Sequence, residues 1–154
     1  MPDEFGEGPN PHSGFGRVNV ANSIAMVEPS DPFSGYGVGV IDEETEEPFI
    51  IQILVPSSSH SLTLKVTMVY ADLPGAALSN DLNLIVVVGD KERHGNQGNQ
   101  DFPIGAIGPF DRSNNVEQVM WPQITGESAK VIVKHYRLLS TRVPLAYAWR
   151  FLEE

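Results

Sequence analysis

The sequence predicts an all-β protein, a jelly-roll-type β-sandwich of about seven to eight strands that follows a short N-terminal loop and helix. Apolar and polar residues alternate over residues 62–70 and again over 145–151, as in strands with one buried face. Turn-forming glycine and proline separate the apolar runs, and no long helical pattern follows residue 28. Many short strands with turns between them favour two packed sheets.

The short helix is expected at residues 20–27. Asn19 precedes it and is a good N-cap residue. Val20, Ile24 and Val27 recur at the spacing of one helix face, so the helix is expected to present an apolar side. Two prolines follow within five residues and prevent its continuation.

Residues 29–47 are rich in glycine and proline and are expected to form a linker that carries one short strand at Tyr36–Ile41. The acidic run at 42–47 is interpreted as a solvated turn, with a cation site as the alternative. Residues 1–11 combine glycine, proline and acidic residues and are expected to be mobile.

From residue 48 onward the pattern is that of strands. The expected strands are residues 49–55, 62–70, 82–88, 116–121, 129–136 and 145–151. Gly89 and Asp90 are turn-forming residues and are expected to end the strand at 82–88. Residues 95–115 are polar and glycine-rich, and a loop of this length in a compact domain is usually functional or held in place.

The composition excludes several classes of function. The chain has no cysteine, which excludes disulfides, thiolate metal sites and a cysteine nucleophile. Its formal net charge is −10, and its lysines and arginines are scattered singly, so nucleic acid is not an expected partner. No apolar run approaches the roughly 20 residues of a membrane span.

Two parts of the chain carry a family resemblance. Residues 14–19 read Gly-Phe-Gly-Arg-Val-Asn, and the middle of the chain has Asn-Asp-Leu-Asn-Leu at 80–84, then His-Gly-Asn at 94–96 and Asn-Asn-Val-Glu at 114–117. In this order they resemble the end of the catalytic domain and the C-terminal, P-domain-like β-barrel domain of bacterial subtilisin-like serine proteases. The resemblance covers roughly residues 12–151. It departs at Tyr70, where the family usually has Trp, and at Asn83, where it usually has Asp.

The resemblance implies three parts: residues 1–28 as the end of a protease catalytic domain with a flexible N-terminus, 29–47 as a linker and 48–154 as the β-sandwich. It implies a non-catalytic accessory domain of a secreted protease that stabilises the catalytic domain in cis and shapes substrate access. No signal peptide opens the chain, as expected of an excised fragment. The alternative is a carbohydrate- or surface-binding module, although Trp121 and Trp149 lie in strand patterns and are expected to be buried.

The chain is not expected to be an enzyme. It lacks the Gly-Thr-Ser-Met-Ala nucleophile motif of subtilases and the Gly-x-Ser-x-Gly motif of other hydrolases. The run at 57–61 places serines beside His60, but a serine and a histidine adjacent in a turn cannot usually adopt the geometry of a nucleophile and its base. The four histidines are too dispersed to indicate zinc.

Calcium is the candidate cofactor, since it takes six to eight oxygen ligands from carboxylates, amides and carbonyls. Such side chains flank the expected loops, and the resemblance makes calcium plausible because these β-barrel domains can hold it. The candidate ligands are Asp81, Asn83, Asp111, Asn115 and Glu117. An asparagine at position 83 would weaken such a site. The alternative is a structural network in which these side chains cap loop amides.

Overall fold

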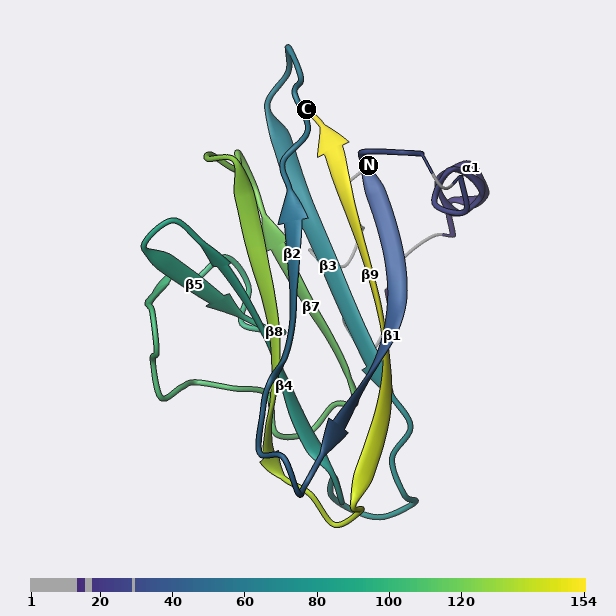
Figure 1. Cartoon of the computed structure of the whole chain (residues 1–154), viewed down its shortest axis with the longest axis vertical. Coiled ribbons are helices and arrows are strands. Elements are labelled where there is room, and N and C mark those ends of the chain that lie inside the picture. The colour runs from purple at the N-terminus through teal and green to yellow at the C-terminus, as the bar shows by residue number, and fades with distance from the viewer. Residues whose placement is uncertain (1–13, 16–17, 29) are drawn as a thin grey trace.

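The computed structural model describes residues 14–15, 18–28 and 30–154. Two antiparallel sheets lie face to face, with one short helix beside them (Figure 1). The elements in chain order are α1 (Val20–Ala25), β1 (Ser34–Asp42), β2 (Phe49–Leu54), β3 (Leu62–Tyr70), β4 (Asp81–Val88), β5 (Lys91–His94), β6 (Phe102–Pro103), β7 (Val116–Trp121), β8 (Ser128–Arg137) and β9 (Arg142–Glu153).

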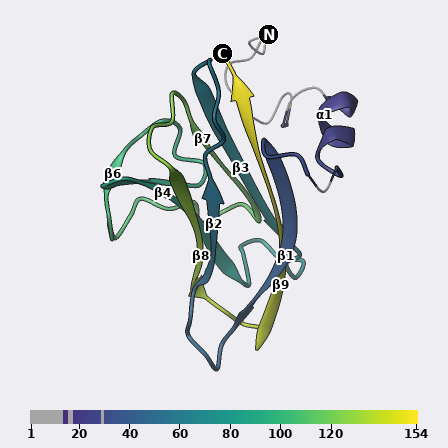
Figure 2. The same cartoon turned by 45° about the horizontal axis from the view of Figure 1, so that its top comes forward.

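The strand order is that of a jelly roll. One sheet has the order β1-β9-β3-β7 and the other has the order β2-β8-β4-β5-β6. The paired strands are therefore nested along the chain: β1 with β9, β2 with β8, β3 with β7 and β4 with β5. This is the order produced when a long antiparallel ribbon rolls into two sheets, and Figure 2 shows the two layers obliquely. The predicted fold class is confirmed.

The core lies between the sheets and follows the predicted alternation. On β3, Leu64, Val66 and Met68 are fully buried, whereas Lys65 and Thr67 lie on the outer face. Residues of β4, β7, β8 and β9 meet them from the two sheets and complete one continuous apolar cluster. The predicted strands at 62–70 and 116–121 have the bounds observed for β3 and β7.

The expected linker at 29–47 contains a full strand of the sandwich. β1 spans Ser34–Asp42 and pairs along its whole length with β9, from Ser34 opposite Arg150 to Asp42 opposite Arg142. The expectation of a linker with only a short strand at Tyr36–Ile41 is therefore corrected. Its glycines suggested flexibility, but the structure gives them a packing role.

The glycines of β1 leave room for aromatic rings. A Cβ atom added at Gly37 would lie 2.5 Å from the hydroxyl oxygen of Tyr147. The same close approach occurs at the two other inward-facing glycines, which lie against further rings: Gly35 against Trp149, and Gly39 against Phe49. The rings therefore cover the inner face of β1, and a side chain on that face would displace them.

Helix α1 forms where the pattern predicts it and ends two residues earlier. The Asn19 side chain accepts a hydrogen bond from the Asn22 amide at 3.0 Å, which confirms the predicted N-cap. Residues 1–13, 16–17 and 29 lie outside the described residues, and with them lies part of the Gly-Phe-Gly-Arg-Val-Asn motif. In the described part of the chain, no helix has the length and apolar character needed to cross a membrane.

We expect Gly37→Ala to destabilise the fold by about 1–3 kcal/mol, because the new methyl group overlaps the Tyr147 ring and overpacking of this kind costs that much. Chemical denaturation monitored by tryptophan fluorescence measures the change. The matched control is Gly75→Ala, whose added Cβ makes an ordinary contact in an exposed loop. Equal stability of the Gly37→Ala variant and the parent chain would contradict the packing role of Gly37.

Candidate functional site

The long loop at 95–115 folds over the outer face of the five-stranded sheet. Along β4, Leu82, Leu84 and Val86 belong to the core between the sheets. The alternating residues Asn83 and Ile85 point to the opposite face, yet they are also buried. The loop therefore creates a second buried region beside β4 and β5, and most of the predicted site residues border it.

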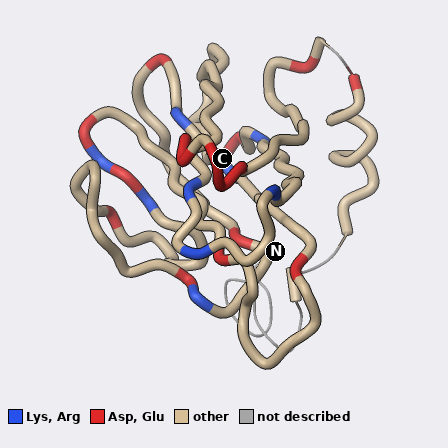
Figure 3. Tube along the Cα trace, turned by 60° about the horizontal axis from the view of Figure 1, so that its bottom comes forward, with Lys and Arg blue, Asp and Glu red and all other residues tan. Residues whose placement is uncertain are grey.

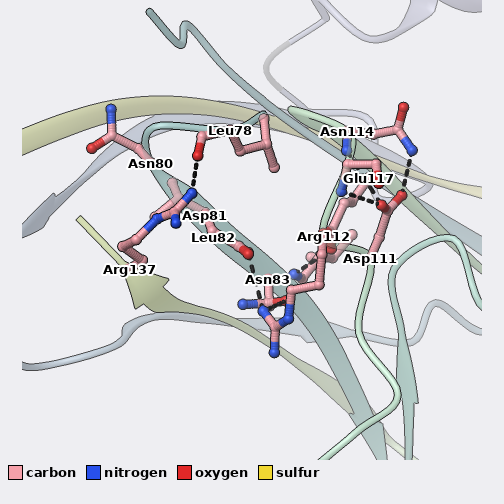
Figure 4. Close-up of polar contacts among 12 residues, drawn as sticks. Leu78, Asn80, Asp81, Leu82, Asn83, Asp111, Arg112, Asn114, Glu117 and Arg137 are labelled. Carbon is pink, nitrogen blue, oxygen red and sulfur yellow. Dashed lines mark hydrogen bonds and ion pairs between the residues drawn. The ribbon is translucent and has the colours of Figure 1, made fainter. Parts of the chain in front are cut away.

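Arg112 from this loop bridges two of the predicted residues. Its guanidinium donates to Asp81 Oδ1 at 3.1 Å and to Asn83 Oδ1 at 3.0 Å (Figure 4). The same guanidinium lies over the ring of Tyr136, 3.8 Å from the ring centre. Asp81 is buried, and burial raises the pKa of its carboxyl while the charge of Arg112 opposes that rise. Arg112 is thus the positive partner of Asp81.

Glu117 enters the same region from the opposite sheet. Its Oε2 accepts a hydrogen bond from the Leu84 amide at 2.7 Å, at the place where the pairing of β4 with β5 stops. The Gly95 amide donates to the Leu84 carbonyl. Glu117 accepts from the Leu84 amide, which in a longer β4–β5 pairing would donate to a backbone carbonyl of β5. Gly95 has no side chain, and a Cβ there would overlap the Glu117 carboxyl group.

The Glu117 carboxyl is almost fully buried, with 1% of the residue exposed. Burial raises its pKa to about 8, and the negative charges of Asp111 and Asp81 add to the rise. Its Oε1 has no hydrogen-bond partner among the described residues. Glu117 is therefore mainly protonated at neutral pH.

Asp111 and Asn115 hold the loop itself. Asp111 Oδ2 accepts from the side chains of Asn96 at 2.7 Å and Asn114 at 2.6 Å. Burial acts to raise the pKa of Asp111, but these hydrogen bonds hold it below its usual value. Asn115 turns away from the cluster, and its side-chain nitrogen donates to the Tyr70 carbonyl at 2.7 Å.

The five predicted residues therefore form a polar network rather than an open set of oxygen ligands. Asp81 and Asn83 face a guanidinium, Asp111 is saturated by amide donors, and Asn115 lies apart. Among the described residues, no group of three or more histidine, aspartate or glutamate side chains has an arrangement that could hold a metal ion. In this arrangement the residues do not fit calcium, which needs several free oxygens around one point. Calcium binding remains a prediction for experiment.

A second buried cluster lies on β5 and was not predicted. His94 Nε2 lies 2.9 Å from Glu92 Oε1, and both side chains are almost completely buried. The Pro109 carbonyl can only accept, so His94 Nδ1 donates to it, at 2.7 Å. Glu92 also accepts from the amides of Gly105 and Ala106. Glu92, His94 and the loop backbone therefore form one hydrogen-bonded cluster.

Aromatic rings complete this cluster. The His94 imidazole is stacked between Phe102 and Phe110, with ring centres 4.3 Å and 4.2 Å away. The rings exclude water from Glu92 and His94, which strengthens the hydrogen bond between them. The only sequence signal for this cluster is a pair of polar residues at alternate positions of a short charged segment, Glu92 and His94. The same pattern is typical of a solvent-exposed hairpin.

The serine–histidine run at 57–61 does not have the geometry of a catalytic triad. Ser59 Oγ lies 3.4 Å from His60 Nδ1, and Glu153 Oε1 lies 3.8 Å from the same nitrogen. A triad needs the serine and the acid on different nitrogens of the histidine, so that the acid orients the ring while the other nitrogen takes the proton. The side chains of His60 and Glu153 are also exposed.

One pocket of about 520 Å³ opens at the end of the sandwich, beside the turn between β4 and β5. Acidic and basic residues alternate along this hairpin (Figure 3). Trp121 lines the pocket, but Arg93 lies over its ring, 4.7 Å from the ring centre, and bonds to Asp101. The remaining lining residues are mainly polar: Asp90, Lys91, Thr125, Glu127 and Ser128.

Comparison of the chain with models of known protein families finds no match, and comparison with curated proteins finds none either.

We expect Glu117→Gln to flatten the dependence of stability on pH. Between the usual pKa of 4.5 and the folded value of about 8, the folded chain keeps a proton that the unfolded chain has lost. Stability from this group is therefore greatest below pH 4.5 and falls as pH rises, by at most about 1.4 kcal/mol per pH unit. Glutamine mimics the protonated side chain and removes that slope.

Urea denaturation at a series of pH values measures this difference. The matched control is Glu127→Gln, which removes an exposed carboxylate from the loop before β8 and should leave the slope unchanged. Parallel curves for the parent chain and the Glu117→Gln variant would contradict the protonated state of Glu117.

We expect Arg112→Met to lower the free energy of unfolding by about 1.5–3 kcal/mol, because buried Asp81 loses its charged hydrogen-bond donor. Thermal unfolding measures the loss. The control is Arg142→Met, which breaks an exposed ion pair with Asp42 worth less than about 1 kcal/mol. Equal losses for both variants would contradict the role of Arg112.

Proposed function

We propose that this chain is a non-catalytic accessory domain of a secreted subtilisin-like protease, which stabilises the catalytic domain by packing against it in cis. The observation that carries the proposal is the apolar face formed by α1 and the turn that follows it. Val20, Ile24 and Val27 are each about 60% exposed, and α1 has no buried residue. An exposed apolar helix face beside a well-formed core indicates a docking surface.

The position of the helix supports this proposal. α1 stands beside the sandwich at the beginning of β1 (Figure 1). Arg150 of β9 contacts it there, because its guanidinium donates to the Asn22 carbonyl at 3.4 Å. The helix is thus held by a polar contact while its apolar side chains stay free for another surface. The family resemblance places the end of a catalytic domain at this helix.

The polar clusters support a structural role as well. Their charged groups are bonded mainly to one another and to loop amides. Catalytic groups need a free position from which to act on a substrate. The contacts of Glu92, His94 and Arg112 instead fix the loop at 95–115. The isolated chain is therefore proposed to have no peptidase or esterase activity.

The alternative is a carbohydrate- or surface-binding module, and one observation favours it. The pocket beside Trp121 is open, lined by hydroxyl and carboxylate groups and large enough for a sugar unit. Arg93 covers one face of the tryptophan ring, which weakens this alternative because sugars usually stack on a free aromatic face.

The test uses the protease encoded by the open reading frame that contains this chain. We expect a Gly-Thr-Ser-Met-Ala motif upstream of Ser13. Ile24→Asp should then lower the inactivation temperature of the full protease without lowering the melting temperature of the isolated chain, because Ile24 contributes nothing to the sandwich core. Leu54→Asp serves as the control, because it places the same charge on an exposed residue of β2 and should leave the inactivation temperature unchanged.

Two results would contradict the proposal. One is an open reading frame with no catalytic sequence ahead of this chain. The other is a full protease whose heat inactivation is unchanged both by Ile24→Asp and by removal of residues 34–154. In that case the protease that lacks residues 34–154 would also no longer bind an insoluble polysaccharide. The second result would support the targeting module instead.

A further inference from the structure

β1 leaves one edge of the four-stranded sheet open. Its neighbour on the other side is β9, where the Phe151 amide donates to the Phe33 carbonyl and the Glu43 amide donates to the Thr141 carbonyl. In an antiparallel ladder every second residue makes such bonds. The odd-numbered residues of β1 therefore bond to β9, and Tyr36, Val38 and Val40 direct their amide and carbonyl groups to the free edge. No strand of the described residues pairs with that edge.

The same three residues present exposed side chains. Tyr36 is 62% exposed, Val38 is 79% exposed and Val40 is 42% exposed. Residues 34–41 contain no charge and no proline, although natural proteins commonly use lysine, proline or a bulge to protect an open edge. The aromatic rings against the glycines hold β1 in place from the inner side. The edge is thus preformed and apolar, and no strand in the described part of the chain covers it.

We propose that this edge pairs with the β1 edge of a second copy of the chain. The two strands run antiparallel around a twofold axis at Val38 and join the two four-stranded sheets into one. In this register Val38 faces Val38 of the other copy, and Tyr36 faces Val40. Every outward amide and carbonyl of the three residues then finds a partner, and the apolar side chains form cross-strand pairs.

Charge favours the antiparallel arrangement. The acidic turn at 42–47 follows β1 directly and carries no lysine or arginine. Antiparallel pairing at Val38 places the two Asp42 residues about 27 Å apart, at about 3.4 Å per residue, which is well beyond the Debye length at physiological salt. Parallel pairing would set the two acidic turns side by side. Helix α1 lies beside the beginning of β1 and leaves its middle open (Figures 1 and 2).

The net charge of −10 opposes association of two copies at long range. Added salt screens this repulsion and leaves the strand pairing largely intact. The dimer is therefore expected to form at high protein concentration and to become more stable as salt is raised. An interface made by ion pairs would show the opposite dependence on salt.

Sedimentation velocity of the full 154-residue chain over a wide concentration range tests the proposal. The parent chain should show a monomer–dimer equilibrium. Val38→Lys should raise the dissociation constant about tenfold or more, because the lysine occurs twice at the twofold axis. Val69→Lys is the matched control: it adds the same charge to an exposed residue on the same face, on β3 rather than on the edge, and should leave the dimer intact.

Val38→Pro provides a second variant. The Val38 amide points to the free edge, and proline has no amide hydrogen. The substitution therefore keeps the hydrogen bonds between β1 and β9 and removes one hydrogen bond to the second copy. Melting curves identify which variants fold, and only folded variants are compared. A parent chain that stays monomeric at every concentration and salt level would overturn the proposal, and so would a dimer weakened equally by Val38→Lys and Val69→Lys.

Discussion

The hydrogen-bonded pair of Glu92 and His94 is buried, and the loop that covers this end of the sandwich is bonded to it. A buried polar group has no water to bond, so the protein must supply its hydrogen-bond partners. Glu92 fills its positions with the amides of Gly105 and Ala106, and His94 donates to the Pro109 carbonyl. Removing one partner would leave a buried hydrogen-bonding group unsatisfied, which costs about 1–3 kcal/mol. One pair of residues on a short strand therefore fixes the loop that covers the sheet.

The ion pair of Asp81 with Arg112 completes the arrangement. Asp81 is the one carboxylate on β4, and Arg112 balances it with a single positive charge. A divalent cation at this place would need more negative oxygens than Asp81 and Asn83 supply. Glu117 adds little negative charge at neutral pH, because burial raises its pKa to about 8. The loop at 95–115 is thus held by side chains of this chain.

The sequence predicts much of the fold because a strand with one buried face has an apolar residue at every second position. β3 and β7 are recovered to the residue, since Leu64, Val66 and Met68 alternate with polar neighbours. β1 is harder to recognise because its inward positions are glycines, whose packing against rings of β9 and β2 involves residues distant in sequence. β5 reads as charged and solvent-exposed, because the loop that buries Glu92 and His94 folds back over them, and no local pattern shows that path.

The same limit applies to the candidate site. The sequence correctly indicates polar residues at strand ends, and Asp81, Asn83, Asp111 and Glu117 do gather there (Figure 4). It does not show that Arg112 lies between two of them, because that contact depends on how a long loop crosses the sheet. Residue type alone therefore suggests a metal-ion site, whereas in the structure the positive group at this place is the guanidinium of Arg112.

Amide hydrogen exchange in the presence of a calcium chelator tests this account most directly. The structure assigns the amides of Gly105 and Ala106 to the Glu92 carboxylate and the amide of Ser113 to Asp111. If internal charges hold the loop, these amides are protected in chelator, and added calcium does not slow their exchange further. Rapid exchange in chelator, with protection that appears only when calcium is added, would contradict the account.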